Sequence, residues 1–101
     1  MPKPQTITIE VTITEHAFNR AKERLGLNQQ AFKKIAVKAY ISGKAHDKAK
    51  GQLRDYISEL YLRYKNANNI RIYGEVVYLF CNSVLITLYH LPNDLKKYTK
   101  F

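Results

Sequence analysis

The chain has 101 residues, of which 17 are Lys or Arg and 8 are Asp or Glu, so its formal net charge is +9. This length predicts a single domain over residues 1–101 and excludes an enzyme with separate cofactor and substrate lobes. A hydrophobic content of 46% excludes a chain that is disordered throughout. The excess of positive charge predicts an anionic partner, RNA or another polyanion, or an acidic protein surface.

Several classes of site are excluded by residue usage. A single cysteine, Cys81, gives neither an internal disulfide nor a cysteine-based zinc site. The three histidines are scattered and lack a supporting carboxylate motif, so we expect no metal. We also expect no cofactor, because no glycine-rich phosphate loop is present. Neither a signal peptide nor a membrane span is found, which predicts a cytoplasmic protein without a membrane partner.

The N-terminal half predicts a strand followed by two helices. From Gln5 to Ile13, Ile or Val alternates with Thr or Glu, the pattern of a half-buried strand rich in β-branched residues. Thr14 is expected to cap a helix that runs to about residue 25 and ends at Gly26. Asn28 is expected to cap a second helix, which Gly43 ends.

The C-terminal half predicts one more helix and a meander. A Lys-rich loop at 44–50 precedes a third predicted helix. Its apolar stripe consists of Leu53, Tyr56, Ile57, Leu60 and Tyr64. Leu60–Tyr64 also alternates, so a strand is the alternative there, but we prefer the helix. Strands are expected at 70–73, 76–81 and 84–91, joined by two tight turns. The predicted class is α+β: an N-terminal strand, two to three helices, then an antiparallel three-stranded meander with the helices packed on one sheet face. Residues 1–5 and 96–101 are expected to be flexible tails.

The two turns also predict a register. Two-residue turns place Arg71 opposite Tyr78, and Tyr78 opposite Thr87. One sheet face is then aliphatic and takes the helices. The other face points away from the core, and it carries Arg71, Tyr73, Tyr78, Phe80, Thr87 and Tyr89. Such a face suits RNA, because arginine binds phosphate and aromatic rings stack unpaired bases. The alternative is that these aromatics only favour half-exposed strands and pack under the tail or a partner subunit.

A second constellation lies on the first helix. His16, Arg20 and Arg24 are spaced i, i+4, i+8 and therefore share one stripe. This stripe sets an imidazole, a candidate general base, beside two guanidinium groups able to hold a phosphodiester. The alternative is an ordinary amphipathic helix whose arginines pair with glutamates at the surface.

These segments together resemble a known superfamily. The helix pattern His16-Ala17-x-x-Arg20-x-x-x-Arg24 is followed by Asn69-Ile70-Arg71-Ile72-Tyr73, Val77-Tyr78-Leu79-Phe80 and Leu85-Ile86-Thr87-Leu88. Over about residues 7 to 92, the chain resembles small phage and mobile-element proteins of the barnase–EndoU–colicin–RelE-like nuclease superfamily. The resemblance implies helices on an antiparallel sheet, and RNA cleavage without metal through attack of the ribose 2′-hydroxyl on the adjacent phosphate.

The resemblance also implies roles for particular residues. His16 becomes the general base or acid, Arg20 and Arg71 become phosphate clamps, and Thr87 becomes a hydrogen-bond donor at the scissile group. Further contacts to nucleic acid are expected from the following residues: Arg24, Lys48, Lys50, Asn69, Tyr73, Tyr78 and Tyr89.

The predicted function is a metal-independent endoribonuclease or an RNA-binding, toxin-like protein, monomeric or homodimeric, with a host or antitoxin protein as a further partner. The alternative is a non-catalytic phage or mobile-element inhibitor that binds a host protein or nucleic acid through its basic surface.

Overall fold

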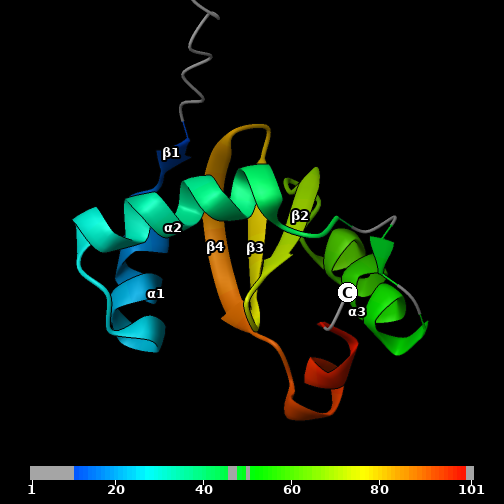
Figure 1. Ribbon diagram of the computed structural model, residues 1–101. Coiled ribbons are helices and arrows are strands. Elements are labelled where there is room, and N and C mark those ends of the chain that lie inside the picture. Colours follow the sequence, from blue (N-terminus) through cyan, green and yellow to red (C-terminus); the bar gives the residue numbers. More distant parts are fainter. Residues whose placement is uncertain (1–10, 46–47, 50, 100–101) are drawn as a thin grey trace, which may run out of the picture.

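The computed structural model describes residues 11–45, 48–49 and 51–99. Its elements are β1 (Thr12–Ile13), α1 (Glu15–Leu25), α2 (Gln29–Ser42), α3 (Gly51–Arg63), β2 (Asn69–Tyr73), β3 (Val76–Cys81), β4 (Val84–His90) and the 3-10 helix η2 (Asn93–Thr99). The α+β class and the chain order of strand, helices and meander are confirmed (Figure 1). Residues 60–63 belong to α3, so the helix predicted there is confirmed and the alternative strand is wrong. Of the predicted first strand, only 12–13 is observed as strand, and residues 5–10 lie outside the described part.

Short-range capping contacts set the limits of α1 and α2. The Ala17 amide donates to Thr14 Oγ1 at 3.1 Å, and the Ala31 amide donates to Asn28 Oδ1 at 2.8 Å. Both bonds satisfy amides that the first helical turn leaves without partners. Gly26 ends α1 with φ at +66°, a conformation that glycine adopts without steric cost. The predicted caps are therefore confirmed.

The strands form one sheet in the order β1-β4-β3-β2, in which β1 is parallel to β4 and the other pairs are antiparallel. The predicted pairing of Arg71 with Tyr78 is confirmed. The predicted pairing of Tyr78 with Thr87 is wrong, because the β3–β4 register shifts by one residue and Ile86 has no counterpart on β3. Beyond this bulge Tyr78 lies opposite Leu88, so one extra residue reverses the face on which Thr87 was expected.

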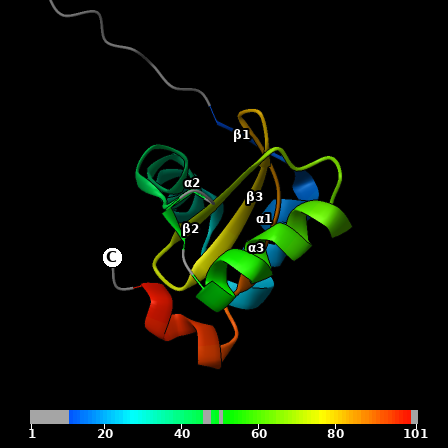
Figure 2. The same ribbon diagram turned by 90° about the vertical axis from the view of Figure 1, so that its right-hand side faces the viewer.

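Helices cover both faces of the sheet, so the predicted packing of all helices on one face is wrong. Leu53, Ile57 and Leu60 of α3 pack against the aliphatic face, which includes Ile70 and Leu79. The opposite, aromatic face packs against α1 and α2. Figure 2 shows α2 and α3 on opposite sides of the sheet. Because both faces are apolar, each requires its own covering layer.

The edge of β2 is protected by two polar contacts. The backbone of Lys44 exchanges hydrogen bonds of 2.8 and 3.0 Å with Ile72, and the Tyr61 hydroxyl accepts from the Ile70 amide at 2.9 Å. These contacts occupy groups that an edge strand would otherwise offer to another chain.

The C-terminal segment packs on the molecule where a tail was expected. Residues 93–99 form η2, Leu95 is buried, and the Lys96 ammonium lies 3.3 Å from a Glu75 carboxylate oxygen. Residues 100–101 of this predicted tail, and the whole of the other predicted tail, 1–5, fall outside the described residues. Among the helices that the structure describes, none has the length and apolar character to cross a membrane.

Candidate nucleic-acid interface

The predicted stripe of α1 is present, but its members have different surroundings. His16 is exposed. Arg20 is paired with Glu23 at 2.8 Å, and their side chains are 37% and 60% exposed. This i, i+3 pair is the surface contact that the amphipathic-helix alternative expects, and solvent makes it weak. Arg24, two turns beyond His16, reaches the sheet instead.

Arg24 joins the end of α1 to the edge of β4. Its Nη1 donates to the carbonyl of Leu88, and its guanidinium carbon lies 4.6 Å from the centroid of the Tyr89 ring. His90 Nε2 lies 2.8 Å from the Arg24 carbonyl oxygen. Because that oxygen only accepts, Nε2 carries the proton. The backbone and the side chain of Arg24 therefore both connect the end of α1 to the edge of β4.

The aromatic part of this region continues onto α3. The hydroxyls of Tyr64 and Tyr89 are hydrogen-bonded to one another, and their ring centroids are 5.8 Å apart. The hydrogen bond to Tyr89 is the main cause that raises the pKa of Tyr64, followed by burial. Burial likewise raises the pKa of Tyr56, which lies on α3 eight residues before Tyr64. Both hydroxyls therefore stay neutral in ordinary buffers and do not repel a phosphate.

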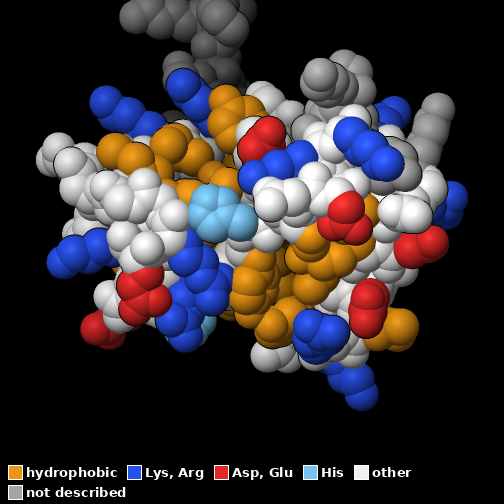
Figure 3. All heavy atoms as spheres, turned by 90° about the horizontal axis from the view of Figure 1, so that it is seen from below, with side chains coloured by type: hydrophobic (Ala, Val, Ile, Leu, Met, Phe, Trp, Pro, Cys, Tyr) orange, Lys and Arg blue, Asp and Glu red, His pale blue; other side chains and the backbone are white. Residues whose placement is uncertain are grey.

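We name this region the α1–β4–α3 surface. Its members are His16, Arg20 and Arg24 of α1, Tyr89 of β4, and Tyr56 and Tyr64 of or next to α3. Figure 3, a view from the lower side of Figure 1, shows Lys or Arg and His side chains directly beside a band of orange side chains, the colour given to hydrophobic residues including Tyr. Cations beside aromatic rings are the composition that binds single-stranded nucleic acid.

Thr87 does not reach this surface through its hydroxyl. The residue is 5% exposed, and its Oγ1 is buried without a hydrogen-bond partner. The register shift places it beside Leu79, on the face that α3 covers. The bulge at residue 86 thus turns the Thr87 hydroxyl, the expected donor at a scissile group, into the core.

Tyr78 is also a core residue. It is 2% exposed, and its ring stacks on Phe32 of α2 at a centroid distance of 6.4 Å. Burial raises its pKa to about 12. Tyr73 is half-buried in the same cluster beneath α1 and α2. The open aromatic face that the sequence predicted is therefore absent for these two residues, because a second helical layer covers it.

Arg71 lies on β2, separated from β4 by β3. Its Nε donates to Asn69 Oδ1 at 2.8 Å, and its Nη1 donates to the Gly43 carbonyl at 3.0 Å. Asn69 thus orients Arg71. The exposed Lys48 lines a pocket together with Arg71 and Gly43, whereas Lys50 lies outside the described residues. The expected cluster of His16 and Arg20 with Arg71 and Thr87 does not form.

The sequence did not indicate Tyr56 and Tyr64 as site residues, although it placed both on the apolar stripe of the third helix. The available pattern was two tyrosines eight residues apart on that stripe. Tyrosine on such a stripe carries a hydroxyl that needs a partner when it is buried. Which strand supplies that partner depends on the face that α3 covers.

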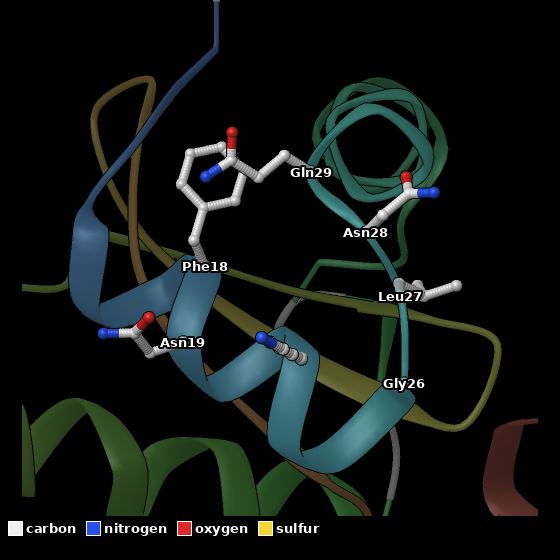
Figure 4. A pocket seen from close by; sticks show the side chains of 7 residues that line it. Phe18, Asn19, Gly26, Leu27, Asn28 and Gln29 are labelled. Carbon is white, nitrogen blue, oxygen red and sulfur yellow. The ribbon is translucent and has the colours of Figure 1, made fainter.

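A cavity of about 620 Å³ lies at the junction of α1 and α2 (Figure 4). It is lined by Phe18, Asn19, Lys22, Gly26, Leu27, Asn28 and Gln29. The Asn28 side chain already caps α2, and Lys22 is the only cation among the described residues of this lining. This cavity is therefore a weaker place for an anion than the α1–β4–α3 surface. Within the described residues, no group of three potential metal ligands occurs.

Comparison with known proteins finds no match: neither a family model, nor a curated protein, nor a solved structure is similar to this chain at a significant level.

Proposed function

We propose that the protein binds single-stranded RNA through the α1–β4–α3 surface and cleaves it without a metal ion. The observation that carries the proposal is the stack of Arg24 on Tyr89, whose hydroxyl is bonded to Tyr64. One patch thereby offers a guanidinium for phosphate and rings for unpaired bases. The net charge of +9 favours approach of any polyanion.

In the proposed reaction, the ribose 2′-oxygen attacks the adjacent phosphorus and the bond to the 5′-oxygen breaks. His16, exposed on the α1 stripe, accepts the proton of the 2′-hydroxyl and returns a proton to the leaving 5′-oxygen. Arg20 and Arg24 bind the phosphate oxygens, where negative charge develops. The products are a 2′,3′-cyclic phosphate and a 5′-hydroxyl, so the step needs no co-reactant. The superfamily resemblance implies the same chemistry.

The test measures binding and cleavage of a labelled single-stranded RNA separately, in EDTA. We expect Arg24→Ala and Tyr89→Ala to weaken binding, since loss of one stacked base costs about 1–3 kcal/mol. Lys34→Ala, an exposed lysine of α2, is the charge-matched control. His16→Ala should abolish cyclic-phosphate formation while binding is retained. RNA binding that is equal in Arg24→Ala and Lys34→Ala would refute the interface.

Non-catalytic binding is the second candidate, and a specific observation favours it. Arg20 and Arg24 already have partners within the protein, and the Thr87 hydroxyl is enclosed. A surface organised in this way can bind without assembling an acid and a base. RNA binding that depends on Arg24, with no cyclic phosphate formed by the wild type, would establish this function. A partner that survives nuclease treatment in a pull-down would instead identify the ligand as a protein.

A further inference from the structure

A second cationic site lies on the opposite edge of the sheet, where α2 ends beside β2 (Figure 1). A cavity of about 300 Å³ is lined there by Ser42, Gly43, Lys44, Ala45, Lys48 and Arg71. Three of these side chains are cationic and one carries a hydroxyl, and among the described residues of the lining none is acidic. An opening of this size suits a small anion and not a nucleobase stack.

Two hydrogen bonds within the protein fix the orientation of the Arg71 guanidinium. Its Nε donates to Asn69 Oδ1, and its Nη1 donates to the Gly43 carbonyl. A guanidinium has five N–H groups, so these two bonds leave donors for a ligand. Because the planar group is already fixed, less conformational entropy is lost when it binds an oxyanion.

Gly43 allows the end of α2 to approach Arg71. A Cβ atom at residue 43 would lie 2.9 Å from the Cβ of Arg71 and 2.3 Å from the Ala39 carbonyl oxygen. Any larger residue would therefore displace the helix end from the strand. The absence of a side chain at this position brings a carbonyl within reach of the guanidinium.

The positive charge around the cavity is larger than the partial negative charge at the end of α2. The C-terminal end of a helix carries about half a negative charge, and the contact of Arg71 with the Gly43 carbonyl offsets it. Lys48 adds a further formal positive charge at the same space. The described lining therefore has a net positive charge that an anionic ligand would neutralise.

We propose that this cavity is a phosphate-binding site, independent of the α1–β4–α3 surface. Its ligand is a phosphate group held by the Arg71 guanidinium and the Lys48 ammonium group, with the Ser42 hydroxyl as an additional donor. The group belongs either to a free phosphorylated molecule or to the backbone of a bound nucleic acid. The chemistry of recognition is the same for both sources.

The test is a titration of the full chain with inorganic phosphate and with pyrophosphate at constant ionic strength. Binding is monitored through the backbone amide NMR signals. We expect saturable shifts at the amides of Gly43, Lys44 and Arg71. Lys48→Gln should weaken binding about fivefold, and Arg71→Lys should weaken it more because the fork of donors is lost. Lys34→Gln is the control and should bind as the wild type does.

Shifts that do not saturate, or equal affinities in Lys48→Gln and Lys34→Gln, would overturn the proposal. Lys48 is exposed, so Lys48→Gln keeps the test valid even where Arg71→Lys loosens the fold. A short RNA without terminal phosphates distinguishes the sources: displacement of pyrophosphate by this RNA identifies the backbone, and no displacement identifies a free phosphate. The Arg24→Ala protein retains phosphate binding in either case, so failure of the RNA interface is seen separately.

Discussion

The Arg24 guanidinium carbon lies 4.6 Å from the centre of the Tyr89 ring, while its Nη1 hydrogen-bonds the neighbouring carbonyl of Leu88. One side chain thus satisfies a carbonyl at the free edge of β4 and covers the ring next to it. The strand β1 pairs only with the first two residues of β4. The rest of that edge depends on α1 for protection, and Arg24 contributes both to stability and to the proposed interface.

Arg24→Ala is predicted to destabilise the fold by about 1–2 kcal/mol, because a charge-assisted hydrogen bond and a cation–π contact are lost together. Arg20→Ala should cost at most about 0.5 kcal/mol, since the Arg20–Glu23 pair is exposed. Urea denaturation of the two variants and the wild type measures the difference. Equal midpoints for both variants would show that the contact of Arg24 with β4 contributes nothing.

Thr87→Val is predicted to leave stability unchanged or to raise it by up to about 1 kcal/mol. The buried Oγ1 of Thr87 has no partner, so replacing it with a methyl group of similar size removes a desolvation cost. Thermal unfolding checks this expectation. RNA cleavage, if present, should also be unaffected. A folded Thr87→Val protein that has lost cleavage would instead place the hydroxyl in contact with substrate.

Gly43→Ala and Gly26→Ala are predicted to destabilise for different reasons. At residue 43 the new Cβ meets the Ala39 carbonyl oxygen at 2.3 Å, so the helix end must shift, at a cost of about 2–3 kcal/mol. At residue 26 no atom lies within 4 Å of the new Cβ. The free-energy cost there comes from the positive φ alone and is about 1 kcal/mol. Denaturation midpoints rank the two variants. The Arg71 amide should shift in the NMR spectrum of Gly43→Ala only.

Tyr78 is predicted to make the fold sensitive to alkali. Its pKa is raised from 10.0 to about 12 by burial, so the folded state holds the phenol proton more tightly than the unfolded chain does. This contribution to stability is complete below pH 10 and is lost as the pH rises towards 12; it amounts to about 2–3 kcal/mol. Tyr78→Phe should therefore lose less stability than the wild type between pH 9 and pH 12. An equal loss of unfolding free energy in the wild type and in Tyr78→Phe over this pH range would contradict the raised pKa of Tyr78.

Local features of the sequence were sufficient to predict the helix limits. Thr14 and Asn28 cap helices, and Gly26 ends one, through contacts within a few residues. The β2–β3 hairpin was predicted equally well, because a two-residue turn determines its register. The basic stripe of α1 was also visible from spacing alone.

The bulge in β4 was not predictable by the same reasoning. The turn at residues 82–83 is tight, as expected, and Cys81 pairs with Val84. The extra residue enters three positions later, where β4 is bounded on its other side by α1 and β1. The Thr14 hydroxyl donates to the carbonyl of Ile86, the residue that β3 leaves unpaired. A contact between residues 72 positions apart thus accompanies the register change.

The sequence by itself determined the α+β class, the order of its elements, the ends of α1 and α2 and the excess of positive charge, because each depends on composition or on neighbours along the chain. Only the tertiary structure decided which predicted residues meet. It placed α3 against the aliphatic face, enclosed Tyr78 and Thr87, separated Arg71 from Arg24 by the width of the sheet, and brought Tyr64 to Tyr89. The physical reason is that a sheet with two apolar faces must be covered twice, and a single inserted residue reverses which side chains each layer covers.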